Sequence, residues 1–143
     1  MDYKNWILKK YQDLIKPVLS DFGPYYAELL LGKGVHAHLD LVKAETFIDW
    51  ARYPGYYSFW YYFEGCEQNI TNRLKNTQLA KYESVLMDFG VGNPVCEIPT
   101  GVFIDNWLDF VIGAVYMSTA VTTDGKLVME FVKGDYLYSN FLI

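Results

Sequence analysis

The chain has 143 residues, of which 52% are hydrophobic and 20% charged, and a formal net charge of −5. This length fits one domain, and the composition is too apolar for intrinsic disorder. No apolar run reaches the roughly 20 residues of a membrane-spanning helix, and the charged start MDYKNWILKKYQDLIK lacks a signal-peptide pattern. We therefore expect a single domain over residues 1–143, cytoplasmic and without a membrane partner.

Acidic residues are concentrated in the C-terminal part of the chain. Residues 1–82 hold ten Lys or Arg against nine Asp or Glu, a balance of +1, whereas residues 83–143 hold two against eight, a balance of −6. No basic residue lies between Lys81 and Lys126. Because like charges add over a Debye length of about 8 Å, this distribution disfavours nucleic acid and favours a cationic partner. The competing interpretation is an acidic surface that only keeps the protein soluble.

The first half of the chain is predicted to be mainly helical. Apolar residues at spacings of three and four predict an amphipathic helix from Tyr3 that ends or kinks near Lys16, because Pro17 cannot donate a helical hydrogen bond. Residues 24–34 and 43–52 are predicted to form two further helices.

Residues 35–42 alternate apolar and polar side chains, the period of a half-buried strand. His36, His38 and Asp40 would share one face of this strand and could ligate a metal with one more ligand. No second His or Cys pair supplies that ligand, so surface or structural histidines are favoured. We expect no metal and no cofactor.

Residues 53–63, YPGYYSFWYYF, hold eight aromatic side chains, whose strand propensity predicts that residues 56–64 join the sheet. A strand would direct one set of side chains toward the core: Tyr57, Phe59, Tyr61 and Phe63. It would place the other set on a partly wet face: Tyr56, Ser58, Trp60, Tyr62 and Glu64. Trp and Tyr are enriched in binding hot spots, so Trp60 and Tyr62 are candidate anchors for a partner. The alternative is that helices cover both faces and every ring is structural.

The next segments mix helical and loop signals. Leu79, Tyr82, Leu86 and Phe89 recur at helical spacing and predict a helix over residues 77–92 that Thr77 caps. Residues 92–101, GNPVCEIPTG, are predicted to form a loop or a short edge strand because they contain two prolines.

Residues 103–114, FIDNWLDFVIGA, are predicted to form a helix. Its apolar face would comprise Ile104, Trp107, Leu108, Val111 and Ile112. Asp105 and Asp109, four residues apart, would lie together on the other face, toward solvent or a partner.

The end of the chain is predicted to form antiparallel strands. Residues 114–132 predict a hairpin with Asp124 and Gly125 as a two-residue turn, and residues 136–143 predict a further strand. Helices in the first half and a hairpin-built sheet in the second predict an α+β fold, with N-terminal helices packed on an antiparallel sheet that is mainly C-terminal.

Few sequence features favour catalysis. Cys66 and Cys96 lie in no recognisable nucleophile context and are expected to be free, buried thiols. No phosphate-binding loop or dinucleotide fingerprint is present. We expect that the protein is not an enzyme.

The order of FIDNWLDF, then TTDGKLVMEF, then YLYSNF resembles in layout the small acidic immunity proteins that bacteria encode beside contact-dependent or polymorphic toxins. The resemblance carries over no functional residue. It implies a cytoplasmic, non-catalytic bacterial protein that binds one toxin domain and blocks its active site. A nuclease toxin presents a cationic groove that an acidic surface can occupy. The contacts we would name are Asp105, Asp109, Glu130 and Asp88, with Trp60 and Tyr62 as anchors.

Two other functions compete with this one. A small-ligand-binding or enzymatic domain could enclose a tyrosine-lined pocket in a curved sheet, as in folds similar to nuclear transport factor 2. A structural or phage-encoded accessory protein is the third hypothesis.

Overall fold

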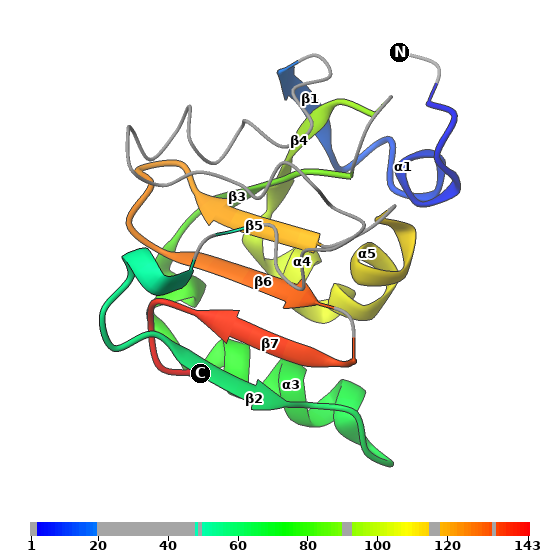
Figure 1. The fold of residues 1–143 in the computed structure, drawn as a ribbon. Coiled ribbons are helices and arrows are strands. Elements are labelled where there is room, and N and C mark those ends of the chain that lie inside the picture. The colour runs from blue at the N-terminus through cyan, green and yellow to red at the C-terminus, as the bar shows by residue number, and fades with distance from the viewer. Residues whose placement is uncertain (1–2, 20–47, 49, 90–92, 115–117, 133) are drawn as a thin grey trace.

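The computed structural model describes residues 3–19, 48, 50–89, 93–114, 118–132 and 134–143 (Figure 1). These residues form an α+β fold, as predicted. The predicted helix over residues 24–34, the predicted strand over residues 35–42 with its histidines, and most of the predicted helix over residues 43–52 lie outside the described residues.

The described part of the chain contains one seven-stranded sheet in which every pair of neighbouring strands is antiparallel. Its strands are β1 (Lys16–Leu19), β2 (Tyr57–Trp60), β3 (Ser84–Met87), β4 (Val95–Pro99), β5 (Ser118–Thr122), β6 (Val128–Val132) and β7 (Tyr136–Ser139). Their order across the sheet is β1-β4-β3-β5-β6-β7-β2. The strands β1 and β2 therefore end the sheet on its two sides.

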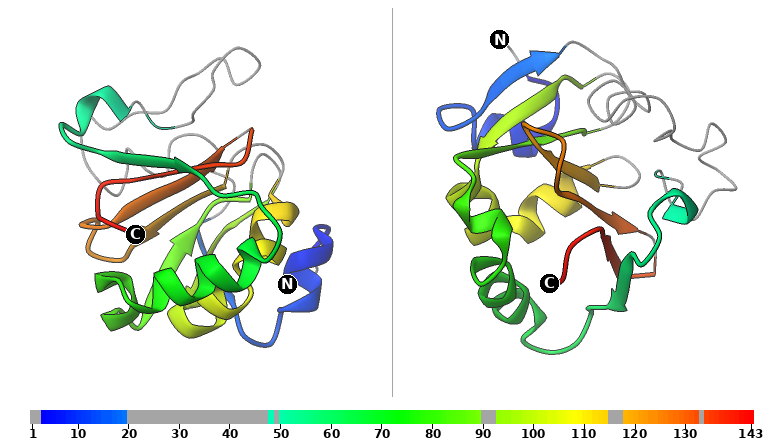
Figure 2. Two further views of the ribbon diagram at one scale, coloured as in Figure 1. Left: turned by 90° about the horizontal axis from the view of Figure 1, so that it is seen from below. Right: turned by 90° about the vertical axis from the view of Figure 1, so that its left-hand side faces the viewer.

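The helices lie on one face of this sheet (Figure 2). They are α1 (Trp6–Lys10), α3 (Cys66–Lys75), α4 (Thr100–Asp105) and α5 (Trp107–Gly113), with a short 3₁₀ helix, η3 (Gln78–Lys81), beside them. Trp107, Phe103 and Phe110 of these helices are fully buried and join the core with Met87 and Phe131 of the sheet. None of these helices is long and apolar enough to cross a membrane.

The opposite face of the central strands is also buried. Val121, Val128 and Glu130 are at most 1% exposed there. A second 3₁₀ helix, η2 (Trp50–Arg52), lies on this side (Figure 2), and both the Ile48 amide and the Trp50 indole donate hydrogen bonds to the Glu130 carboxylate. Both sides of β5 and β6 are thus covered.

The predicted N-terminal helix is much shorter in the structure. Asn5 caps α1 by accepting hydrogen bonds from the amides of Ile7 and Leu8, but the helix ends at Lys10. Residues 16–19 then form β1, where the missing amide proton of Pro17 is tolerated because the strand lies at a sheet edge.

The prediction of a helix over residues 77–92 is wrong. Thr77 does cap a helix, but only the 3₁₀ helix η3, and Ser84–Met87 is a strand between β4 and β5. A strand whose two faces are both buried shows no polar alternation, so its apolar spacing does not distinguish it from a helix. Residues 95–99 form a strand, β4, but not an edge strand, because β4 pairs with β3 on one side and with β1 on the other.

The predicted helix over residues 103–114 is two helices. Asn106 lies at φ −129° and ψ 25°, between α4 and α5, and its side-chain amide donates to the Val102 carbonyl at 3.0 Å. Such local bonds compete with helical continuation. Because the axis breaks there, Ile112 is exposed rather than buried.

The C-terminal hairpin is confirmed, with a longer turn than predicted. β5 pairs with β6 with Val121 opposite Val128, and the Thr122 amide still bonds to the Leu127 carbonyl. Only Gly125 of the predicted turn pair has a positive φ, so the connection is not a two-residue turn.

We predict that Gly113→Ala destabilises the protein by about 1–3 kcal/mol, the typical cost of overpacking. A β-carbon at residue 113 would lie 2.4 Å from Cγ1 of the buried Ile7, where α5 meets α1. Gly101→Ala is the matched control, because a β-carbon there meets no atom within 4 Å. Urea denaturation measures both, and a Gly113→Ala variant as stable as the Gly101→Ala variant would contradict the close approach.

Candidate functional site

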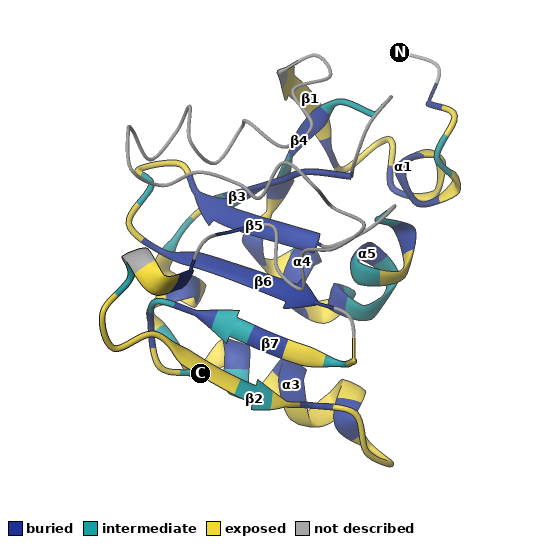
Figure 3. Cartoon of the chain, viewed as in Figure 1, coloured by how far each residue is buried: buried dark blue, intermediate teal, exposed yellow. Residues whose placement is uncertain are grey.

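β2 and β7, at one side of the sheet, contain exposed residues (Figure 3), and several of these are aromatic. We define the aromatic edge by six residues of these strands and their flanks: Tyr56, Ser58, Trp60, Tyr62, Tyr136 and Tyr138. The exposed fraction is 53% for Trp60, 61% for Tyr62 and 43% for Tyr136. Large rings exposed side by side in this way are typical of a surface that binds another protein.

The pairing of β2 with β7 builds this surface. Trp60 lies opposite Tyr136 and Ser58 opposite Tyr138, so their side chains leave the sheet on the same side. The ring of Tyr56 stacks on that of Tyr138, with 5.7 Å between centroids, and Tyr138 lies 5.9 Å from Trp50. The buried indole of Trp50 therefore packs beside the aromatic edge, on the same face of the sheet.

The alternate residues of β2 hold the strand on the core. Tyr61 is buried, and its ring makes edge contacts with Trp107 and Phe131 at 5.5 and 5.6 Å. Burial, followed by the charge of Asp135, raises the pKa of Tyr61 to about 12, so this phenol stays neutral. The guanidinium of Arg73 lies 4.1 Å from the centre of the Phe59 ring. Tyr61 thus has a structural role.

The predicted division of the stretch into two faces is correct only at its centre. Phe59 packs against the core and Tyr61 is buried, whereas Tyr57 and Phe63 are exposed. The strand covers only Tyr57–Trp60, so a period of two does not extend to Phe63. Trp60 and Tyr62 lie on the surface, which is compatible with their predicted role as anchors.

The rim of the aromatic edge is acidic. Residues 53–67 and 134–143 contain three acidic residues, Glu64, Glu67 and Asp135, and no Lys or Arg. Glu64 and Asp135 form no ion pair with any residue that the structure describes. Glu64 and Asp135 are thus unpaired among the described residues, whereas Arg73 contributes one positive charge at Phe59, on the core side of β2.

Asp105 and Asp109 do not share a helix face, contrary to the prediction. Asp105 pairs with Lys75 of α3 at 3.3 Å, and both side chains are mostly exposed. Asp109 accepts hydrogen bonds from Lys10 at 2.8 Å and from the Tyr11 hydroxyl at 2.6 Å. The hydrogen bond from Lys10, and after it that from Tyr11, hold the pKa of Asp109 below its usual value. Asp109 thus joins α5 to the N-terminal segment.

Glu130 and Asp88 are buried, at 0% and 5% exposure. Glu130 accepts hydrogen bonds from Ile48, Trp50 and, at 3.3 Å, from the Thr119 hydroxyl. A buried carboxylate does not fit a surface contact, so neither residue belongs to the aromatic edge or its rim.

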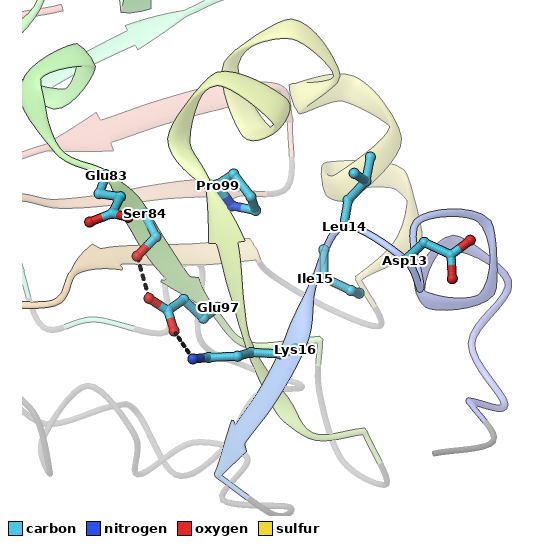
Figure 4. A pocket seen from close by; sticks show the side chains of 8 residues that line it. All are labelled: Asp13, Leu14, Ile15, Lys16, Glu83, Ser84, Glu97 and Pro99. Atoms are coloured by element: carbon cyan, nitrogen blue, oxygen red, sulfur yellow. Dashed lines mark hydrogen bonds and ion pairs between the residues drawn. The ribbon is translucent and has the colours of Figure 1, made fainter.

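A pocket of about 310 Å³ lies at the other side of the sheet, between the end of the N-terminal segment and β3 and β4 (Figure 4). Its lining includes Lys16, Ser84 and Glu97, and no aromatic residue. Figure 4 shows Glu97 between the other two: it accepts a hydrogen bond from Ser84 and forms an ion pair with Lys16 at 3.2 Å. The hydrogen bond from Ser84, and after it Lys16, lowers the pKa of Glu97. Its carboxylate is occupied by these neighbours.

The described residues offer little for catalysis. They contain no group of three or more His, Cys, Asp or Glu side chains that could hold a metal ion. Cys66 and Cys96 are free and buried, as predicted. Burial, and after it the charge of Asp88, raises the pKa of the Cys96 thiol to about 12, which disfavours the thiolate that a nucleophile needs.

Sequence reasoning missed the contribution of β7. Tyr136 and Tyr138 alternate with the buried Leu137, and that period of two is a signal the sequence contains. No local pattern predicts that they lie beside Trp60, because about 75 residues separate the two strands in the chain. Comparison of the chain with family models, with curated proteins and with solved structures found no match.

We predict that Asp109→Asn lowers the free energy of unfolding at pH 7 by about 1 kcal/mol, the worth of a partly screened pair of charge-assisted hydrogen bonds. Because the folded-state pKa of Asp109 is depressed, this contribution is present above the usual pKa of about 3.9 and disappears as the pH falls through the folded value. Chemical denaturation at pH 7 and near pH 2 measures it. Asp105→Asn is the control and should change nothing measurable; an equal loss in both variants would contradict the distinction.

We predict that the Cys96 thiol reacts with Ellman's reagent at pH 8 more than about a hundredfold slower than an exposed cysteine, because it is buried and protonated. The Cys66→Ser variant isolates this thiol. Unfolding in guanidinium should restore full reactivity, and fast reaction of the folded variant would refute the assignment of Cys96 to the core.

Proposed function

We propose that this protein is an immunity-type inhibitor, which binds a cationic protein, a toxin domain, and blocks its active site. The observation that carries the proposal is the aromatic edge: four of its rings, on adjacent strands and their flanks, are more than 40% exposed. Exposed apolar side chains gathered on neighbouring strands are typical of protein-binding surfaces. Trp and Tyr are also the residues that most often dominate binding energy.

The acidic rim supports a cationic partner. Glu64 follows the aromatic stretch and Asp135 precedes Tyr136 in the chain, and neither forms an ion pair with a described residue. Complementary charge at the rim of an interface accelerates association and excludes partners of the same sign. A nuclease, whose substrate groove must attract phosphate, is a partner of the required sign.

The contact set of this proposal differs from the one that sequence alone favoured. Trp60 and Tyr62 remain, and Tyr136 joins them. Asp105 remains an exposed acid but lies on α4 rather than at the aromatic edge. We leave out Glu130 and Asp88, which are buried, and Asp109, which is bound to Lys10 and Tyr11.

The competing function is a ligand pocket lined by tyrosines, and among the described residues no observation favours it. The pocket beside β1 has no aromatic lining, and the tyrosines of residues 56–62 are either exposed or, in the case of Tyr61, packed in the core. The lining of this pocket contains three acidic residues and one lysine, a combination that does not favour a particular small molecule.

Co-purification of this chain with the product of the gene immediately upstream, followed by isothermal titration at two salt concentrations, tests the proposal. We expect nanomolar affinity that weakens as salt rises, because screening reduces the attraction of exposed charges. Absence of binding, or an upstream gene unrelated to toxins, would refute the inhibitor function.

We predict that Trp60→Ala combined with Tyr62→Ala weakens this binding at least about 30-fold, the threshold of a hot spot. The melting temperature should stay within about 2 °C, because both side chains are more than half exposed. Trp6→Ala is the matched control: Trp6 is 55% exposed on α1, far from β2 in Figure 1. Equal losses of affinity in the double variant and in this control would contradict the assignment of binding to the aromatic edge.

A further inference from the structure

The two strands that end the described sheet are protected very differently. Isolated edges risk pairing with other chains, and proteins usually block them with proline, lysine or a bulge. β1 has all three: Pro17 has no amide proton, Lys16 is exposed, and the register with β4 shifts between Pro17 and Leu19. This edge is closed to a further strand.

β2 has none of these protections. Its four residues, YSFW, pair with β7 in continuous register without a bulge. Residues 56–63 contain no proline, glycine or lysine. Three of its four residues are aromatic, and three of the four are exposed. Such an edge is either an aggregation hazard or a binding site.

The hydrogen-bond pattern shows which backbone groups of β2 face outward. The amide of Tyr61 donates to the carbonyl of Asp135 at 2.9 Å, so this pair exchanges hydrogen bonds. In an antiparallel ladder, hydrogen-bonded pairs alternate with pairs that are not hydrogen-bonded to each other. The register therefore makes Phe59 and Leu137 a hydrogen-bonded pair, and Trp60 and Tyr136 a pair without hydrogen bonds between them. The amide and carbonyl groups of Ser58 and Trp60 consequently point away from β7, toward the side of β2 on which the described residues place no further strand.

We propose that β2 receives an extended segment of the partner protein as an eighth strand, and that this segment carries Lys or Arg side chains. The inference rests on the proposed function and gives it a binding mode. Backbone groups of Ser58 and Trp60 would pair with the incoming strand, and side-chain pockets would add specificity, as in other strand-addition complexes. Trp60 and its neighbours would contact the apolar side chains of that segment.

Charge argues for a basic segment and against a second copy of this chain. Glu64 and Asp135 lie close to β2 in the chain or in the fold and form no ion pair with the described residues. Two copies of this chain, each with a formal net charge of −5, repel each other, whereas a cationic segment is attracted. A basic strand would neutralise Glu64 and Asp135.

Proline at residue 58 tests the backbone contact alone. The amide of Ser58 faces outward, so Ser58→Pro removes a group that β7 does not use, and edge positions of this kind tolerate proline. Ser58→Thr is the matched control, because it keeps the amide proton and a strand-forming side chain. We expect Ser58→Pro to weaken binding of the upstream gene product about tenfold or more in isothermal titration, the loss produced by one or two backbone hydrogen bonds. Ser58→Thr should bind as the wild type does.

A second measurement does not depend on the proline variant folding. Amide hydrogen exchange of the wild type, with and without the upstream gene product, should show new protection at Ser58 and Trp60 in the complex. Binding without that protection, or full affinity in a folded Ser58→Pro variant, would overturn strand addition while leaving the inhibitor function intact. No binding of the wild type would overturn both. Dimerisation of the isolated chain that Ser58→Pro abolishes would assign the edge to a second copy and overturn the basic partner.

Discussion

The burial of Tyr61 between the sheet and α5 is the constraint that the candidate interface depends on. Its ring contacts Trp107 and Phe131 and its amide bonds to Asp135. Side chains of a strand alternate, so a shift of one residue would exchange the buried and exposed sets. Fixing Tyr61 and Phe59 inward therefore fixes Trp60 and Ser58 outward, in both their side chains and their backbone groups. The core thus determines what the surface can bind.

The position of Tyr61 gives β2 two properties: an edge with backbone groups that β7 does not use, and exposed aromatic rings. An edge strand attracts any chain with unpaired backbone groups, whereas exposed aromatic rings supply affinity for one partner. On β2 both are present, and the acids beside them add a preference for positive charge. The opposite edge, with its proline, bulge and lysine, has the features of a surface kept free of partners. The asymmetry of the two edges is the reason to regard the exposure of β2 as functional.

The sequence predicted the fold class and the C-terminal hairpin because two strand-like segments flank a recognisable turn signal at Asp124 and Gly125. It failed for Ser84–Met87, since a strand covered on both faces has no alternation and its apolar spacing imitates a helix. It failed also at Asn106, where one side-chain hydrogen bond divides a helix and separates two acids that a continuous helix would place together. Alternation along the predicted strand placed Trp60 and Tyr62 on the surface, where the structure has them, and their role as anchors stays a prediction. Tyr136 was not placed beside them, because its neighbour in space is distant in sequence, and the burial of Glu130 depends on contacts that no local pattern encodes.

Amide hydrogen exchange of the free protein across residues 57–61 tests the central claim most directly. If Tyr61 fixes the register as described, the amides of Phe59 and Tyr61 are protected, and those of Ser58 and Trp60 between them exchange at rates close to those of an unfolded chain. Uniform protection along the strand would mean that another segment already occupies this edge. Uniform exposure would mean that β2 is not held on β7, and either result would contradict the account.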